Sequence, residues 1–268
     1  MKWHTIGSRL ALLVVFGCGG AEATSPTPAT PAPSAAGPVE GKPTAAPSVA
    51  TESAPAAPPV VGDALEVGPT QYKKVFENDS IRVLEVTFKP GDKVGLHRHP
   101  DHAAYVISSG KMRMSTNGSP PQDMDLKQGQ AVFLPAMEHT MENVGSTDMK
   151  AVIVELKATT FAPAPAGGDP AKVGPTIYKS ILDNDRVRVF EVTFKKGAKI
   201  AAHVHPDHVA YVLSGGKLRV TSGKAAPQDF DLQPRQAVYL PAQSHTAENK
   251  GTTEIKVVVF ELRGPAKS

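Results

Sequence analysis

The sequence predicts an all-β chain that folds into two similar small domains, and two observations support this prediction. First, two copies of one sequence match at a constant offset of 106 residues, without a gap and with about half of the aligned positions identical. Second, short apolar segments follow one another between turn residues, and no stretch keeps the 3.6-residue period of a helix. This pattern is typical of a β-sandwich or barrel, in which closure disposes of the sheet edges.

The first copy shows where the strands are expected. Residues 82–88 alternate cleanly, with Leu84, Val86 and Phe88 on one face and Val83 on the other. Gly, Pro, Asn and Asp residues interrupt the chain at short intervals and predict turns. Further strands, rich in β-branched and apolar residues, are expected over 105–107, 111–114, 131–134 and 150–156.

Two Ala/Pro-rich segments separate the expected domains. Residues 21–65 consist almost entirely of Ala, Pro, Ser, Thr, Gly and Val, so they bury too little apolar surface to offset the entropy of ordering. We therefore expect a disordered N-terminal linker. The predicted order is a signal segment over 1–18, this linker over 19–66, the first barrel over 67–158, a second linker over 159–170 and the second barrel over 171–264.

The N-terminus has the pattern of a targeting segment. Lys2 and Arg9 are followed by an apolar run over 10–16, which is too short to span a bilayer. Cys18 is the single cysteine, which excludes an intramolecular disulfide. The segment resembles a bacterial lipoprotein signal, and this resemblance implies that Cys18 is lipidated and that the protein is a periplasmic or cell-envelope lipoprotein. An ordinary secretory signal that contains a cysteine is the alternative.

Charge limits the classes of partner. The net charge is +3 and the basic residues form no block, whereas a nucleic-acid-binding protein clusters Lys and Arg on one face. We therefore expect a small-molecule partner, no nucleic acid, and membrane contact only through a lipid anchor. Whether the two barrels pack on each other or dimerise stays open.

The histidines carry the functional signal, because the string H-x-H-P-D-H occurs once in each copy. His97 and His99 are two residues apart and share one face of a strand, and neutral imidazole is a ligand for transition metals. All histidines except His4 belong to two matched sets, which favours a metal site over a polar lining of the barrel. The candidate ligands are His97, His99, His102 and His139 in the first copy, and His203, His205, His208 and His245 in the second.

These motifs resemble those of the cupin superfamily. Five residues separate Gly91 from the first H-x-H, and Gly129, Pro135, His139 and Asn143 match the family's second motif with one residue missing. The resemblance covers both copies. It implies two tandem jelly-roll barrels, a bicupin, each holding one divalent metal (Fe, Zn, Cu, Ni or Mn) through the H-x-H pair and the histidine of the second motif.

One ligand of the family pattern is missing. Cupins carry a glutamate after H-x-H, but Ala103 and Val209 stand at the expected places. An alignment on Tyr105 puts His102 at the glutamate position, which would make a four-imidazole site. His102 and its counterpart His208 would then be ligands, or they would orient another imidazole instead.

Other polar residues have plainer interpretations. Asp101 and Asp207 are expected to cap the Pro turns, and Glu142 and Glu248 to face solvent because their parity is opposite to that of the motif histidines. Arg113 and Arg219 are expected to be solvated, and Tyr105 and Tyr211 to pack between sheets.

Two functions are therefore open. The chain is either a metal-dependent enzyme that resembles cupin dioxygenases, or a non-catalytic module that binds a small ligand or a metal at the cell envelope. The missing glutamate speaks against an oxalate-degrading bicupin. The sequence names no catalytic residue and no substrate.

Overall fold

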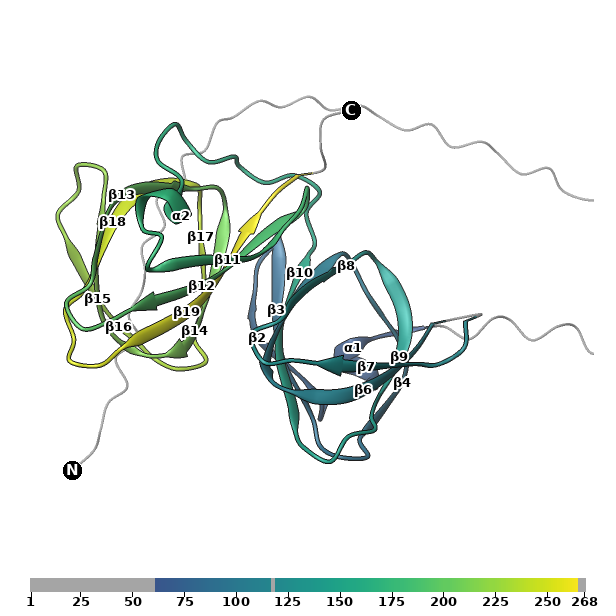
Figure 1. Cartoon of the computed structure of the whole chain (residues 1–268). Coiled ribbons are helices and arrows are strands. Elements are labelled where there is room, and N and C mark those ends of the chain that lie inside the picture. Colours follow the sequence, from purple (N-terminus) through teal and green to yellow (C-terminus); the bar gives the residue numbers. More distant parts are fainter. Residues whose placement is uncertain (1–60, 117–118, 265–268) are drawn as a thin grey trace, which may run out of the picture. The chain divides into compact units, whose positions relative to one another are not determined.

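The computed structural model describes residues 61–116 and 119–264 (Figure 1). Most of these residues lie in strands, and the helices among them are the short α1 (Ala64–Val67) and α2 (Pro170–Val173). The all-β fold with two tandem barrels is therefore confirmed. No helix in the described part of the chain is long and apolar enough to cross a membrane.

The first repeat forms a barrel from two sheets of five strands each. Their orders are β1-β4-β9-β6-β7 and β2-β3-β10-β5-β8, so most strands pair with partners that are distant in sequence, as in a jelly roll. The strands are β1 (Gly62–Asp63), β2 (Tyr72–Glu77), β3 (Ile81–Phe88), β4 (Lys93–His99), β5 (His102–Ser108), β6 (Gly110–Thr116), β7 (Gln122–Leu126), β8 (Ala131–Leu134), β9 (Met137–Asn143) and β10 (Met149–Leu156).

The second repeat has the same plan, with sheet orders β11-β12-β19-β14-β17 and β13-β18-β15-β16. In place of a paired first strand, the Gly168 carbonyl accepts a hydrogen bond from the Val204 amide at 3.0 Å. The strands are β11 (Tyr178–Asp183), β12 (Val187–Phe194), β13 (Lys199–His205), β14 (His208–Ser214), β15 (Gly216–Ser222), β16 (Gln228–Leu232), β17 (Ala237–Leu240), β18 (Gln243–Asn249) and β19 (Ile255–Leu262).

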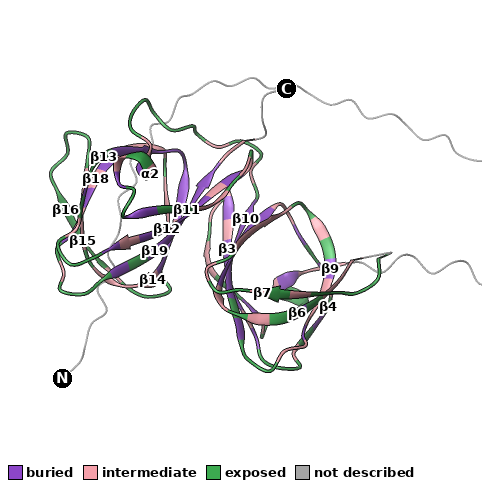
Figure 2. Cartoon of the chain, in the orientation of Figure 1, coloured by how far each residue is buried: buried purple, intermediate pink, exposed green. Residues whose placement is uncertain are grey.

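Each barrel has its own apolar core, and Figure 2 shows the buried residues along its strands. The face of β3 predicted to be apolar does enter the first core, because Leu84, Val86 and Phe88 are all buried there. In the second barrel Phe190, Val192 and Phe194 take the equivalent places on β12. Alternation along one strand thus assigns one of its faces to the barrel interior.

The opposite strand faces form a third buried cluster that both repeats share. Its members come in pairs 106 residues apart, so the two sheets contribute equivalent residues. They are Ile81, Val83, Ala103, Tyr105, Val152, Val154 and Leu156, with Val187, Val189, Val209, Tyr211, Val258, Phe260 and Leu262. The repeats therefore pack on each other within one compact unit, which is one of the two arrangements that the sequence left open.

Reciprocal hydrogen bonds accompany this apolar contact. The Tyr105 hydroxyl donates to Glu191 Oε1 at 2.8 Å, and the Tyr211 hydroxyl donates to Glu85 Oε1 at 2.7 Å. Both tyrosines are buried, as the prediction that they pack between sheets requires. Arg235 also pairs with Glu85, and it does so from a left-handed conformation with φ of 70°. In the first repeat Gly129 holds the equivalent position, with φ of 82°.

The predicted end of the N-terminal linker is wrong, because residues 62–66 are ordered. Asp63 Oδ1 accepts a hydrogen bond from the Leu65 amide at 2.9 Å, and Glu66 Oε2 accepts from the Asp63 amide at 3.1 Å. This capping box starts α1 and buries Ala64 against the first core. The first barrel therefore begins at Gly62. The second linker likewise ends at Gly168, since Asp169 caps α2.

The remaining N-terminal predictions lie outside the described residues. They are the signal segment over 1–18 with the lipidated Cys18, and the linker from residue 19 to residue 60.

Candidate metal centre

The two H-x-H motifs lie at the ends of equivalent strands, β4 and β13. Their antiparallel neighbours β9 and β18 carry the histidines of the second motif, so that His97 is directly opposite His139 and His203 is opposite His245. Opposite residues on neighbouring strands have Cβ atoms about 5 Å apart, which brings their rings together. His97 and His99 are both buried while Arg98 between them is exposed, as the two-residue period predicts.

A β-bulge aims the first histidine of each pair. Val94 is opposite Met141 and His97 is opposite His139, so β4 carries one residue more than β9 between these pairs. The same shift occurs in β13 between Ile200 and His203. Inside the bulge, His97 Nδ1 donates to the Gly95 carbonyl at 2.8 Å, and His203 Nδ1 donates to the Ala201 carbonyl at 2.9 Å. A carbonyl only accepts, so the Nε2 of each ring is left free of hydrogen.

Three imidazoles converge in each barrel. In the first, the potential ligand nitrogens of His97, His99 and His139 all lie within 4.8 Å of one another. The ring centroid of His97 is 4.5 Å from that of His139 and 5.0 Å from that of His99. The second barrel repeats this triad with His203, His205 and His245. All six rings are buried.

A carboxylate holds the second histidine of each pair. His99 Nδ1 donates to Glu155 Oε1 at 2.6 Å, and His205 Nδ1 donates to Glu261 Oε1 at 2.7 Å. Each glutamate comes from the last long strand of its repeat, β10 or β19. Such a bond fixes the tautomer and presents the other ring nitrogen to the site, as carboxylates commonly do for metal-binding histidines.

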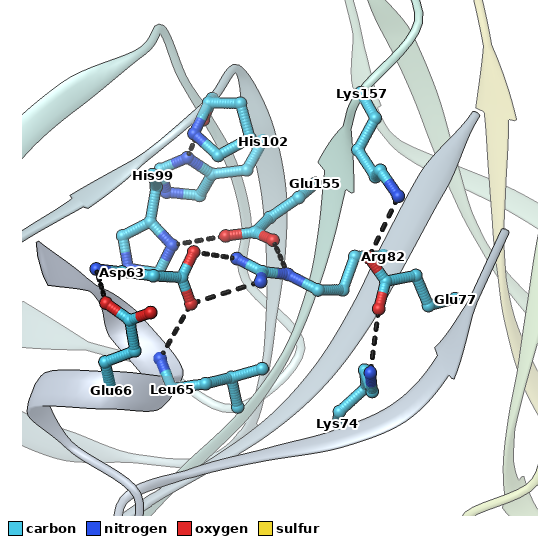
Figure 3. A network of polar contacts seen from close by, with 11 residues as sticks. Asp63, Leu65, Glu66, Lys74, Glu77, Arg82, His99, His102, Glu155 and Lys157 are labelled. Carbon is cyan, nitrogen blue, oxygen red and sulfur yellow. Dashed lines mark hydrogen bonds and ion pairs between the residues drawn. The ribbon is translucent and has the colours of Figure 1, made fainter. Parts of the chain in front are cut away.

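The first site extends this contact into a charged network (Figure 3). Arg82 Nε donates to the second oxygen of Glu155, and the other Arg82 nitrogens donate to both oxygens of Asp63 at 3.1 and 2.7 Å. Burial raises the pKa of Glu155, but the hydrogen bonds from His99 and Arg82 outweigh this effect and leave the pKa lowered. Glu155 therefore stays ionised and both of its oxygens are occupied.

The second site differs in this respect. Arg188, the counterpart of Arg82, donates to Asp169, and within the described residues no hydrogen bond joins it to Glu261. Burial raises the pKa of Glu261 to about 7, which Arg188 and Arg263 oppose only in part. The two sites therefore share their histidine geometry and differ in the charge behind it.

The triads fit a divalent transition metal. Burial lowers the pKa of His97 and of His203, and burial together with neighbouring histidines lowers the pKa of His139 to about 3 and that of His245 to about 2. These four rings are therefore neutral near pH 7, and neutral imidazole is the form that binds metal. The buried His99 Nε2 has no hydrogen-bond partner among the described residues, and an ion at the triad would satisfy it.

His102 and His208 lie next to the triads but are not part of them. They begin β5 and β14, which belong to the other sheet of each barrel. Their Nδ1 atoms donate to the carbonyls of Pro100 and Pro206, each at 2.8 Å. The His102 ring centroid is 4.9 Å from that of His99, and in the second barrel the His208 centroid is 4.6 Å from that of His205 and 6.5 Å from that of His245.

The aspartates of the H-P-D-H strings hold the loops, as expected for turn residues. Asp101 Oδ1 accepts from the Ala136 amide at 2.8 Å, and Asp207 accepts from the amides of Ala162 and Ala242 at 2.9 Å each. Among the described residues, no hydrogen bond joins either carboxylate to a histidine ring.

The other polar side chains also have structural roles. Glu142 and Glu248 are partly exposed and pair with Lys93 and Lys199. Arg113 lies on the solvent side of its strand and pairs with Asp123, and Arg219 pairs with Asp229 in the same way.

The sequence interpretation missed two pairs of residues at the sites. Glu155 and Glu261 support the histidines, and the hydroxyls of Tyr72 and Tyr178 lie beside them. In both pairs the same residue type occurs at equivalent positions of the two copies, and this identity was the available signal. Their separation from the H-x-H motifs concealed the contact, since Tyr72 precedes His97 by 25 residues and Glu155 follows His99 by 56.

Fold and site together define a protein of two jelly-roll barrels, each with a buried histidine triad suited to a metal ion. The family model described as "Cupin domain" matches residues 84–155 and 190–261, one match in each repeat. The chain therefore belongs to the cupin family, and it is a bicupin.

Three solved structures resemble the chain in fold. An oxalate decarboxylase is 16% identical, covering 72% of this chain and 72% of that one with a TM-score of 0.54. The oxalate decarboxylase of Bacillus subtilis, described as having Mn(II) centres, is 14% identical over 74% of this chain and 77% of that one, with a TM-score of 0.50. AerE from Microcystis aeruginosa is 15% identical over 71% and 96%, with a TM-score of 0.50. At these identities the likeness concerns the fold. A search of the curated proteins found no match.

Proposed function

We propose that this bicupin works outside the cytoplasm, holds one divalent transition-metal ion in each barrel, and binds or transforms a small molecule there. The observation that carries the proposal is the pair of buried triads, His97, His99 and His139 with their counterparts in the second barrel. Buried nitrogens without a hydrogen-bond partner are costly, and one such nitrogen lies on each of His99, His139 and His245. An ion shared by three converging rings accounts for two matched sets of buried imidazoles.

The donor chemistry suits Fe, Zn, Cu, Ni or Mn, because imidazole is a borderline ligand. A bound ion would act as a Lewis acid or as an activator of oxygen. The chain's own residues supply the rest: the triads hold the ion, Glu155 and Glu261 fix the tautomers of His99 and His205, and the barrel wall excludes water.

Oxalate is not the substrate that we propose. Glu155 and Glu261 are the carboxylates that form hydrogen bonds to triad histidines. They accept from Nδ1 of His99 and His205, so they do not lie on the side of the ring where Nε2 would bind an ion. No carboxylate joins either triad in the described residues. The candidate metal ligands of this chain are therefore histidines alone, whereas the cupin pattern includes a glutamate.

A non-catalytic role is the second candidate, and the crowding of the triad favours it. The Tyr72 ring centroid is 5.2 Å from that of His97 and 5.5 Å from that of His99, and His102 closes a further side at 4.9 Å from His99. Aromatic rings on two sides leave less room for a substrate beside the ion.

Oxygen consumption distinguishes the two candidates. The chain is loaded with each candidate metal and offered a panel of diketones, phenolics and thiols, and oxygen uptake is recorded together with product formation. If the bicupin is an oxygenase, at least one metal and substrate pair should consume oxygen, and the His97→Ala and His203→Ala double variant should not. Saturable binding of panel compounds without turnover for any metal would support the non-catalytic module.

The location outside the cytoplasm has its own test at Cys18. If Cys18 is lipidated, the wild-type chain should sediment with membranes and Cys18→Ser should become soluble or stay unprocessed. Several acyl chains anchor a protein stably, whereas one does so marginally. Cleavage before Cys18 also removes Trp3, the single tryptophan, so the mature protein should show tyrosine fluorescence only. A soluble wild-type protein with a free Cys18 thiol would refute the anchor.

A further inference from the structure

A tyrosine hydroxyl lies against the ligand nitrogen of each site. Tyr72 begins β2, and its hydroxyl oxygen is 3.0 Å from His97 Nε2. Tyr178 begins β11, and its hydroxyl oxygen is 3.3 Å from His203 Nε2 and 3.5 Å from His205 Nε2. Both tyrosines are buried, and both occupy the same place in their repeats.

The tautomers show which atom the hydroxyl faces. His97 Nδ1 donates to the Gly95 carbonyl and therefore carries the ring hydrogen, so Nε2 accepts a hydrogen bond from the Tyr72 hydroxyl. A metal ion at the triad would take this Nε2 lone pair. The phenol oxygen would then have lost its acceptor and would lie beside the ion.

These spacings are the ones that donors of a single ion have. Two donors, each about 2.1 Å from an ion, are about 3.0 Å apart at a right angle and about 3.4 Å apart at the tetrahedral angle. Tyr72 is 3.0 Å from one histidine nitrogen, and Tyr178 is 3.3 and 3.5 Å from two. Each hydroxyl oxygen therefore already lies at the distance of a co-ligand from at least one triad nitrogen.

We propose that Tyr72 and Tyr178 supply the fourth protein donor of the two metal centres, as phenolates, in place of the glutamate that the cupin pattern has and this chain lacks. The proposal rests on the proposed metal function of the triads. Burial raises the pKa of both phenols, so the positive charge of the ion would have to offset this rise. On binding, the phenol would lose its proton to solvent and its oxygen would bond to the ion, so each site would gain one negative charge. Each donor set would then consist of three imidazoles and one phenolate.

The competing fourth donor, His102, has a weaker geometric claim. The His102 and His208 rings each lie close to one triad ring, at centroid distances of 4.9 Å from His99 and 4.6 Å from His205. Their nitrogens, however, do not belong to the two groups of ligand atoms that all lie within 4.8 Å of one another. His102 and His208 are better described as rings that pack beside the triad and keep it dry.

Packing fixes the tyrosine rings and makes a clean test possible. The Tyr72 ring meets Phe88 edge to face at a centroid distance of 5.9 Å, and Tyr178 meets Phe190 at 5.5 Å. A Tyr→Phe substitution keeps these contacts and removes only the oxygen. The chain has three other tyrosines, and Tyr105 and Tyr211 lie in the cluster between the barrels and serve as matched controls.

Iron(III) is the probe, because a phenolate bound to iron(III) absorbs visible light by charge transfer whereas imidazole ligands alone do not give this band. The full chain is loaded anaerobically with iron(II), oxidised, freed of excess iron and measured for metal content, absorption and phenolate vibrations by resonance Raman. We expect two irons and a visible band in the wild type. The Tyr72→Phe and Tyr178→Phe double variant should keep most of its iron and lose the band, and each single variant should lose about half of it.

Two control variants sharpen the assignment. The Tyr105→Phe and Tyr211→Phe double variant should keep the band, and so should His102→Ala with His208→Ala. Iron bound to the triads without a band in the wild type, or a band that survives Tyr72→Phe with Tyr178→Phe, overturns the tyrosine proposal and leaves the metal function standing. A wild type that binds no iron or other divalent metal overturns both.

Discussion

Alanine at both His97 and His203 should reduce the metal content of the chain from two ions to almost none. Each substitution removes one of three converging nitrogens. The same nitrogen is the hydrogen-bond acceptor of the Tyr72 or Tyr178 hydroxyl, so that acceptor is lost as well. Two imidazoles hold a divalent ion much more weakly than three do, and loss of even a supporting partner typically costs about 10–100-fold in affinity. Isothermal titration with zinc or cobalt at neutral pH measures both the stoichiometry and the affinity.

Arg98→Ala is the matched control for this experiment. Arg98 lies between the two first-site histidines, but it is exposed and points away from them, so this variant should bind two ions with unchanged affinity. The single variants His97→Ala and His203→Ala should each retain one ion. An unchanged stoichiometry in the double variant would remove these residues from the site.

The metal-free protein should lose stability steeply as the pH falls below about 6.5, the ordinary value for histidine. The folded chain keeps its buried rings neutral, since burial lowers the pKa of His102 to about 4 and those of His205 and His208 to about 3. Between these values and 6.5 the unfolded chain binds more protons, so acid favours unfolding. Each such ring contributes up to about 1.4 kcal/mol per pH unit, and the contributions of neighbouring rings do not add fully.

Glu261 acts in the opposite direction. Its pKa is raised to about 7 in the folded protein, so it stabilises the fold at low pH and that contribution is lost as the pH rises through 7. Seven rings with lowered pKa values outnumber this one carboxyl, so the net slope should still be a loss in acid. Those rings are His97, His102, His139, His203, His205, His208 and His245.

Urea unfolding of chelator-treated protein at several pH values between 7.5 and 4.5 tests this expectation. His139→Gln with His245→Gln should show a shallower slope, because these two rings have among the most strongly lowered pKa values and glutamine does not titrate. A wild-type free energy of unfolding that stays constant from pH 7 to pH 5 would show that the buried rings titrate normally.

The duplication made most of the fold predictable from the sequence. Strands expected over 82–88 and 150–156 are β3 and β10, and their alternation placed Leu84 in the barrel core. Alternation could not show that the opposite face of β3, with Val83, packs on the second repeat. That face is apolar only in part, since it also carries Glu85, and the partner of Glu85 lies 126 residues away at Tyr211.

The triads were predictable for a local reason, whereas the rest of each site was not. The two-residue spacing of His97 and His99 puts both rings on one face wherever the strand lies. The same argument fails for His102, because the Pro-Asp turn moves the chain into the other sheet and parity is lost there. Tyr72 comes into contact through sheet pairing over long sequence distances, and no local pattern encodes that contact.

The start of the first barrel shows the same limit at smaller scale. Composition placed the end of the linker at residue 66, because Ala and Val continue up to that point. The capping box at Asp63 and its ion pair with Arg82 order the chain from Gly62 onwards, and Arg82 is 19 residues away. The capping box and this ion pair together set the start of the barrel, and average composition could not locate it.

If each barrel holds one metal ion on its histidine triad, the metal content of the purified protein will show it. The full-length protein is purified without chelators, incubated with a slight excess of a divalent transition metal, passed through gel filtration and analysed by inductively coupled plasma mass spectrometry against protein concentration. We expect close to two ions per chain, one for each triad. A content that stays near zero with iron, zinc, copper, nickel and manganese alike would contradict it.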